Sequence, residues 1–179
     1  MFYLFLADGF EETEALAPLD MMRRAKIEVK TVGVTGEFVT GSHGVTVKAD
    51  LKPEEISFNN IDGVVLPGGM PGTVNLGKSE TVTKAAVYCA ENGKITAAIC
   101  AAPSVLGNLK ILKGKKATCF PGFEKELEGA TYTAAPVEID GNVITGKGAG
   151  CAILFGKAIV EKAVSAEAAN KVCGDMQCP

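Results

Sequence analysis

The segment ITAAICAAPSVLG, residues 95–107, predicts a strand that turns directly into a helix. Its first half is a short run of small and β-branched residues, which is typical of a strand buried on both faces. Pro103 suits the first turn of a helix, where its missing N–H costs no hydrogen bond. Ala101 and Ala102 leave room for a sharp turn. We therefore expect Cys100 at an elbow above the carboxyl edge of a sheet.

The rest of the chain alternates in the same way between apolar runs and helical patterns. Strands are predicted at residues 2–7, 27–34, 45–50 (paired with the segment before it), 61–67, 94–100 and 116–120, and in a hairpin that turns at residues 141–142. Helices are predicted at residues 12–25, 81–92, from 103 onward, at 123–127, 150–164 and 166–173. This alternation predicts an α/β three-layer sandwich, with residues 1–179 as a single domain.

Composition and charge exclude several classes of partner. The net charge is −3 and the basic residues are scattered, so no nucleic-acid partner is indicated. No apolar run approaches the roughly 20 residues of a membrane helix, and the short apolar start lacks the basic residues of a signal peptide. We therefore expect a cytoplasmic protein with no membrane partner and with reduced cysteines.

Neither a metal nor a cofactor is expected. The six cysteines form no C-x-x-C pair, and the chain has one histidine. The glycine-rich segment PGGMPG (67–72) lacks the Lys-Ser/Thr of a nucleotide-binding loop. A second glycine-rich segment, GKGAGCAILFG (146–156), looks like a dinucleotide-binding motif, but no strand that ends in an acidic residue follows it. It is therefore interpreted as a close-packed turn into a helix.

Two interpretations of Cys100 stay open from the pattern alone. A helix N-terminus would place partial positive charge near the sulfur and favour the reactive thiolate. Free cysteine is also among the most buried residue types, so Cys100 as a packing residue is the alternative.

Glu14 is the second candidate. On a helix over residues 12–25 it shares a stripe with Met21 and Ala25, whereas Glu12 falls near the polar arc. A carboxyl group that faces the interior must be paired or protonated. The alternative is that Glu11, Glu12 and Glu14 merely favour a helix N-terminus.

Four segments in this order resemble the ThiJ/PfpI superfamily, in the clade of the parkinsonism-associated deglycase DJ-1 and bacterial YajL. They are ADGFEETEALAPLDMMRRA (7–25), VVLPGGMPGTVNL (64–76), AAICAAP (97–103) and ITGKGAG with AIVE (144–150 and 158–161). The resemblance implies a flavodoxin-like, mostly parallel sheet, similar to class I glutamine amidotransferases, and a homodimer.

The resemblance also assigns roles to residues. Cys100 matches the reactive cysteine, and Glu14 matches the protonated glutamate that hydrogen-bonds its thiolate. Gly69 and Ala101 match the backbone donors of an oxyanion-like pocket. Members are described as glyoxalase- or deglycase-type enzymes acting on methylglyoxal, glyoxal or their protein adducts. Others are described as oxidative-stress sensors or chaperones, and older annotation of the family name concerns thiamine thiazole phosphate biosynthesis.

The sequence departs from the family pattern at one catalytic position. Phe120 stands where the family has a histidine, so acid–base steps fall to Glu14, water or a partner subunit. The only histidine, His43, stands where relatives carry an arginine, and it and Arg24 are candidates for an anion site or a dimer interface. Cys119 either resolves an oxidised Cys100 or is a buried strand cysteine. We expect an enzyme acting on α-oxoaldehydes or their adducts, with a sensor that does not turn over as the alternative.

Overall fold

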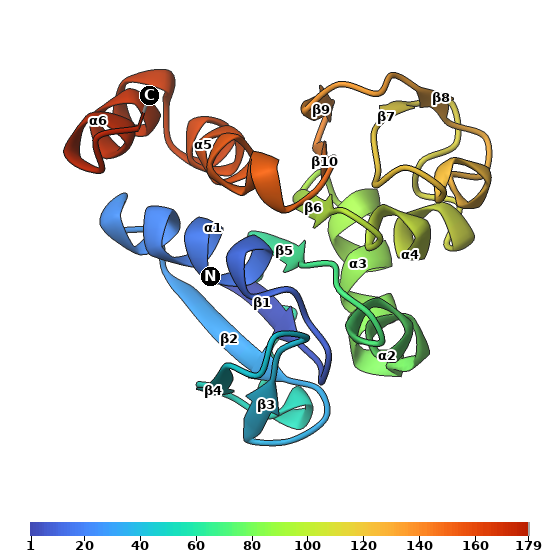
Figure 1. Ribbon diagram of the computed structural model, residues 1–179, viewed down its shortest axis with the longest axis horizontal. Coiled ribbons are helices and arrows are strands. Elements are labelled where there is room, and N and C mark those ends of the chain that lie inside the picture. The colour runs from blue at the N-terminus through green and yellow to red at the C-terminus, as the bar shows by residue number, and fades with distance from the viewer. Residues whose placement is uncertain (179) are drawn as a thin grey trace.

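A six-stranded sheet forms the centre of the protein, and the computed structural model describes residues 1–178 (Figure 1). The strand order is β2 (Val29–Gly33), β1 (Phe2–Leu6), β5 (Gly63–Leu66), β6 (Ile95–Ile99), β10 (Val143–Gly146) and β9 (Val137–Asp140). All neighbours are parallel except β9, which pairs antiparallel with β10 at the edge. The predicted α/β fold with a mostly parallel sheet is confirmed.

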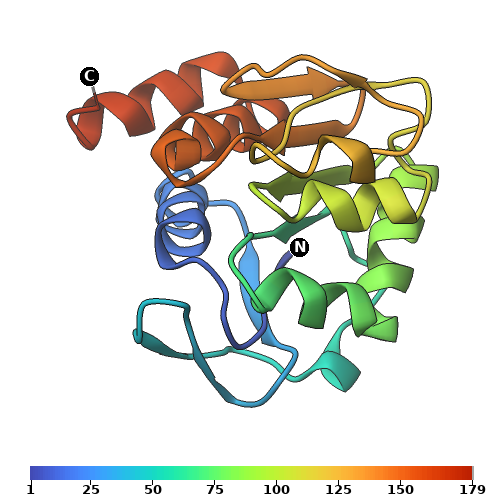
Figure 2. The ribbon, with the colours of Figure 1, turned by 45° about the vertical axis from the view of Figure 1, so that its right-hand side comes forward.

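Helices cover both faces of this sheet (Figures 1 and 2). One layer holds α1 (Glu12–Arg24), α5 (Ala152–Ala163) and α6 (Ala166–Asp175), and the other holds α2 (Gly72–Lys78), α3 (Glu80–Glu91) and α4 (Pro103–Asn108). Strand side chains alternate between the layers. In β1, Leu4 and Leu6 pack in the cluster with α1 and α5, and Phe5 packs in the cluster with α3 and α4. None of the helices within residues 1–178 is long and apolar enough to cross a membrane.

Smaller elements surround the sheet. They are the β3–β4 hairpin (Phe38–Thr40 and Thr46–Lys48), the parallel pair β7 (Lys116–Ala117) and β8 (Thr131–Tyr132), and the 3₁₀ turns Pro53–Glu55, Glu124–Glu126 and Ala149–Cys151. The strand predicted at 116–120 is therefore wrong in its second half. There, the Thr118 amide donates to the Thr145 hydroxyl and the Phe120 amide to the Cys100 carbonyl, instead of joining a ladder.

The sheet order brings three loops together. β1, β5 and β6 are adjacent and parallel, so the segments after them emerge at one edge. These segments are the residues leading into α1, the glycine loop 67–72 and the turn at Cys100. The loop continues into α2, a helix that the glycine-rich sequence did not predict.

Close packing of two helices fixes the position of α1. Gly156 of α5 lies against α1, and a Cβ atom there would lie 2.6 Å from the Met21 sulfur and 3.1 Å from Pro18 Cα. Gly174 of α6 has nothing within 4 Å of such a Cβ position. Two helical glycines in one layer thus have opposite surroundings.

We predict opposite effects of substitution at these glycines. Gly156→Val should lower the free energy of unfolding by about 1–3 kcal/mol through overpacking. Gly174→Ala should raise it by roughly 0.5–1 kcal/mol through helix propensity. Urea denaturation of both variants measures the two effects. A Gly156→Val variant as stable as the parent would contradict the packing described.

Candidate functional site

Cys100 lies on a strained turn between β6 and α4. Its φ is +66°, a left-handed value that a residue with a side chain adopts at a cost of about 1–3 kcal/mol. Two backbone hydrogen bonds hold the turn, from the Cys100 amide to the Gly146 carbonyl (2.9 Å) and from the Phe120 amide to the Cys100 carbonyl (2.8 Å). The predicted elbow is confirmed in its geometry.

The glycine loop after β5 lets a carboxyl group reach this turn. A Cβ atom at Gly68 would lie 2.6 Å from both Cys100 Cβ and Glu14 Oε2, so only glycine fits between them. Gly69 has φ +89°, and a Cβ there would overlap the Glu11 amide. The loop is fastened to α1 by a hydrogen bond from the Glu11 amide to the Gly68 carbonyl, 2.9 Å long.

Glu14 is buried, as its place on the apolar stripe indicated, and it lies beside the Cys100 thiol, as the family resemblance implied. Its side chain is 1% exposed, and Oε2 accepts a 2.9 Å hydrogen bond from the Gly68 amide. Oε1 is buried with no hydrogen-bond partner among residues 1–178. Burial raises the pKa of Glu14 to about 7, although hydrogen bonds from the thiol and from Gly68 oppose this rise. The carboxyl group therefore keeps its proton in mildly acidic solution.

The thiol and the carboxyl compete for one negative charge. Burial raises the pKa of Cys100 to about 12, and the charge of an ionised Glu14 raises it too. The amides of Ala101 and Gly69 hydrogen-bond the sulfur and act in the opposite direction. The pair thus loses one proton near neutral pH and resists losing the second. The helix end expected near Cys100 is present, because α4 begins at Pro103, but α4 has only six residues and burial raises rather than lowers the pKa of Cys100.

The structure therefore brings together Cys100, Glu14, Gly69 and Ala101. Phe120, which stands where the family has a histidine, is 48% exposed. Its ring lies 3.3 Å from the place that a Cβ atom of Gly148 would take. Cys119 is fully buried in the cluster with α3 and α4, and burial raises its pKa to about 11. It lies in the loop after β7 rather than in a strand.

Glu12 is a residue whose environment the sequence analysis misplaced. It is 9% exposed rather than part of a solvated arc, and it accepts hydrogen bonds from the His43 amide (2.7 Å) and the Val45 amide (3.3 Å) and faces His43 Nδ1 (2.9 Å). Burial opposes its ionisation, but these bonds outweigh it and lower the pKa of Glu12 to about 2. The pairing raises the pKa of His43. A loop 30 residues away supplies the partners, so no local pattern could show them.

Arg24 and His43 do not form one site. The Arg24 guanidinium pairs with Asp20 at 2.7 Å near the end of α1, whereas His43 pairs with Glu12 at its start. Donor atoms of Glu11, Glu12 and His43 lie within 4.8 Å of one another, a spacing that could hold a metal ion. The Glu12 oxygens and His43 Nδ1 are already engaged with each other, and Glu11 caps α1 through the Glu14 amide. The cluster is therefore accounted for by internal hydrogen bonds.

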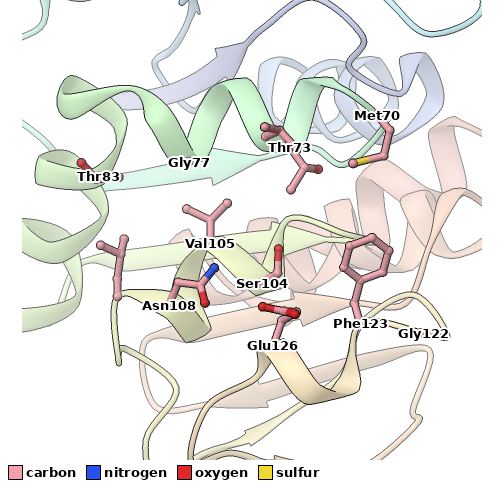
Figure 3. A pocket seen from close by; sticks show the side chains of 12 residues that line it. Met70, Thr73, Gly77, Thr83, Ser104, Val105, Asn108, Gly122, Phe123 and Glu126 are labelled. Carbon is pink, nitrogen blue, oxygen red and sulfur yellow. The ribbon is translucent and has the colours of Figure 1, made fainter.

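A cleft of about 420 Å³ opens between α2, α4 and the loop at Gly122–Glu126, and residues next in sequence to the site, rather than Cys100 or Glu14 themselves, line it (Figure 3). Its lining includes the side chains of Met70, Thr73, Ser104, Val105, Asn108 and Glu126. Met70 follows Gly69 directly, and the Ser104 hydroxyl donates to the Ala101 carbonyl at 2.6 Å. The Thr73 hydroxyl is buried with no partner among the described residues. No local sequence pattern indicates this cleft, because separate segments build it.

Sequence comparisons identify relatives across nearly the whole chain. Residues 2–162 match the model of the DJ-1/PfpI family. The chain is 38% identical over 174 residues to Protein DJ-1 homolog B of Arabidopsis thaliana, covering 96% of this chain but 40% of that protein. It is 38% identical to the Parkinson disease protein 7 homolog of Danio rerio, covering 94% and 92% of the two chains. A Pyrococcus abyssi protein named a deglycase is 33% identical, covering 79% and 86%.

Solved structures share the fold. Oxidized DJ-1 of Toxoplasma gondii superposes with a TM-score of 0.94 at 31% identity, over 98% of this chain and 97% of that one. A cysteine-to-alanine mutant of a DJ-1 superfamily protein from Salmonella typhimurium gives a TM-score of 0.94 at 31% identity, over 99% and 98%. The match extends through every element that carries the site.

The raised pKa of Glu14 predicts a pH dependence of stability. Because the folded protein holds this proton more tightly than the unfolded chain, the stabilisation is complete below pH 4.5 and is lost as the pH rises to about 7. Glu14→Gln, neutral at every pH, should remove this loss, which amounts to about 3 kcal/mol. Urea denaturation of both proteins across this range measures the difference. Parallel pH profiles would contradict the buried, protonated carboxyl.

Proposed function

The chain belongs to the DJ-1/PfpI family, and on this premise we propose that it is a cysteine-dependent enzyme acting on α-oxoaldehydes. Methylglyoxal, glyoxal and their early adducts with amines or thiols are the proposed substrates. The observation that carries the proposal is the Cys100 sulfur, held on a strained elbow with two backbone donors and a protonatable carboxyl against it. An archaeal relative that carries the name deglycase agrees with this chemistry.

The first step forms a bond between the Cys100 sulfur and the aldehyde carbon. Above neutral pH the pair carries one negative charge, and when that charge is on the sulfur, Glu14 holds the proton. Attack moves the charge to the former carbonyl oxygen, where the Gly69 and Ala101 amides are placed to stabilise it. Glu14 then protonates this oxygen and becomes the carboxylate, leaving a hemithioacetal.

The second step moves a proton between neighbouring carbons. The Glu14 carboxylate removes the proton from the sulfur-bearing carbon and returns it to the adjacent carbon, while the hemithioacetal hydroxyl proton moves to the former ketone oxygen. The former ketone thus becomes an alcohol and the former aldehyde a thioester. Water hydrolyses the thioester, which releases lactate from methylglyoxal and restores the thiol. The sum is addition of water, and it requires no external oxidant or reductant.

The cleft between α2 and α4 supports adducts as substrates. An adduct carries the oxoaldehyde carbons on an amine or thiol, so it needs space for this carrier next to the reacting carbon. The cleft begins at Met70 and Ser104, close in sequence to both oxyanion donors. Its apolar wall at Val105 and its polar groups at Asn108 and Glu126 fit the stem and the polar end of an amino-acid side chain.

A sensor that does not turn over is the second candidate, and Phe120 favours it. An aromatic side chain at this position supplies no proton donor or acceptor, so the acid–base steps fall to Glu14, water or a partner subunit. In a sensor, peroxide would oxidise Cys100 to a sulfenic or sulfinic acid that hydrogen-bonds Glu14. The homodimer and the cytoplasmic location stay predictions of the sequence.

Lactate formation distinguishes the two candidates. We expect the purified protein to convert methylglyoxal to lactate and Cys100→Ser to abolish this conversion, while Cys173→Ser on α6 retains it. Enzymatic assay of lactate measures the rate. Equal rates in the parent and in Cys100→Ser would exclude Cys100 as the nucleophile. An inactive parent whose Cys100 is oxidised first by peroxide would favour the sensor.

Filling the cleft should raise KM for adducts and leave KM for the free oxoaldehyde nearly unchanged. Gly77 of α2 lines the cleft, and a Cβ there would lie 3.6 Å from Val105, an ordinary contact. Gly77→Leu should raise KM for the hemithioacetal of methylglyoxal with N-acetylcysteine about fivefold and leave free methylglyoxal within about twofold. Gly77→Ala is the matched control and should leave both unchanged. Equal losses on both substrates would show that the carrier does not occupy the cleft.

A further inference from the structure

The end of α6 forms a turn that brings two residues together. Gln177 has φ +55°, its amide donates to the Gly174 carbonyl (3.0 Å), and the Cys178 amide donates to the Cys173 carbonyl (2.9 Å). This pair of hydrogen bonds around a left-handed residue is the Schellman motif. In this motif, the residue whose carbonyl accepts the longer-range hydrogen bond contacts, through its side chain, the residue that follows the left-handed one. Here both of these residues are cysteines.

The two thiols touch each other at the surface. Both cysteines are free and half-buried, and the Cys173 thiol is hydrogen-bonded to the Cys178 thiol. Cys173 also packs against the hydrophobic cluster under α5 and α6, which fixes one member of the pair. Burial and Cys178 raise the pKa of Cys173, whereas the charge of Lys157 on α5 acts in the opposite direction. Contact, exposure and a nearby cation are features of thiols that react as a pair.

We propose that Cys173 and Cys178 form a redox-active dithiol, separate from Cys100, which hydroperoxides oxidise to an intramolecular disulfide. One thiolate attacks a peroxide oxygen, forming a sulfenic acid and releasing water or alcohol after protonation. The second thiol attacks that sulfur, the S–S bond forms, and the sulfenic oxygen leaves as water. The two sulfurs together supply the two electrons that reduce the hydroperoxide. A small-molecule thiol reverses the reaction by exchange.

The fold favours this closure over other fates of the sulfenic acid. The backbone hydrogen bond from the Cys178 amide to the Cys173 carbonyl keeps the two residues side by side, so the partner thiol stays near the oxidised sulfur. A second oxidation of the same sulfur requires another peroxide molecule. The closure depends on the left-handed conformation of Gln177, which glycine adopts readily and a β-branched residue does not.

Mass spectrometry of the peroxide-treated full chain tests the proposal. Cleavage after Lys171 gives a peptide that contains both cysteines. We expect this peptide to lose two hydrogen atoms, to resist alkylation and to recover both thiols after reduction. Cys173→Ser and Cys178→Ser should abolish this change, and Cys151→Ser, a half-buried cysteine elsewhere, should not. Sulfinic acid on one cysteine with the other still alkylated, or a bond between two chains, would overturn the proposal.

A pair of substitutions at Gln177 tests whether the turn organises the thiols. Gln177→Gly keeps the left-handed residue and should form the disulfide at a rate close to that of the parent. Gln177→Val disfavours it and should slow closure about tenfold. The rate is read from the same peptide in a peroxide time course. Equal rates in the two variants would contradict a closure set by this turn.

Discussion

The contact between the Glu14 carboxyl and the Cys100 thiol is the constraint on which the rest of the site depends. The buried Glu14 carboxyl and the half-buried Cys100 thiol lie against each other over a glycine, with few groups available to solvate charge. Only one of them can ionise at moderate cost, so the pair holds a proton near neutral pH. In the proposed reaction, Glu14 gives this proton to the former carbonyl oxygen, and its carboxylate then transfers another proton between the two carbons.

The fold supplies the rigidity that this contact needs. Adjacent parallel strands β1, β5 and β6 deliver α1, the glycine loop and the Cys100 turn to one edge of the sheet. Gly68 permits the approach, and close packing at Gly156 keeps α1, and with it Glu14, in position. Hydrogen bonds with two further segments hold the strained turn: the Cys100 amide donates to the Gly146 carbonyl, and the Phe120 amide donates to the Cys100 carbonyl. A site with a buried charge and a strained nucleophile is thus supported from several sides of the sheet.

Local patterns predicted the features that depend on neighbours in sequence. The buried strands are continuous apolar runs, the elbow follows from Cys100 and Pro103, and the inward face of Glu14 follows from helical periodicity. The errors arise where distant segments meet. The hairpin loop at His43 buries Glu12, side-chain and loop hydrogen bonds end the strand at Ala117, and separate segments build the cleft. The balance of burial against a short helix end at Cys100 likewise requires coordinates.

The protonation state of Glu14 tests the central claim most directly. Isotope-edited infrared spectroscopy of the parent, with Glu14→Gln as the reference, reports the carboxyl C=O stretch of this one residue across a pH titration. The structure predicts that the protonated band persists above the ordinary pKa of 4.5 and disappears with a midpoint near 7. A band that disappears with a midpoint near 4.5 would show an ionised Glu14 beside Cys100 and would contradict the shared proton.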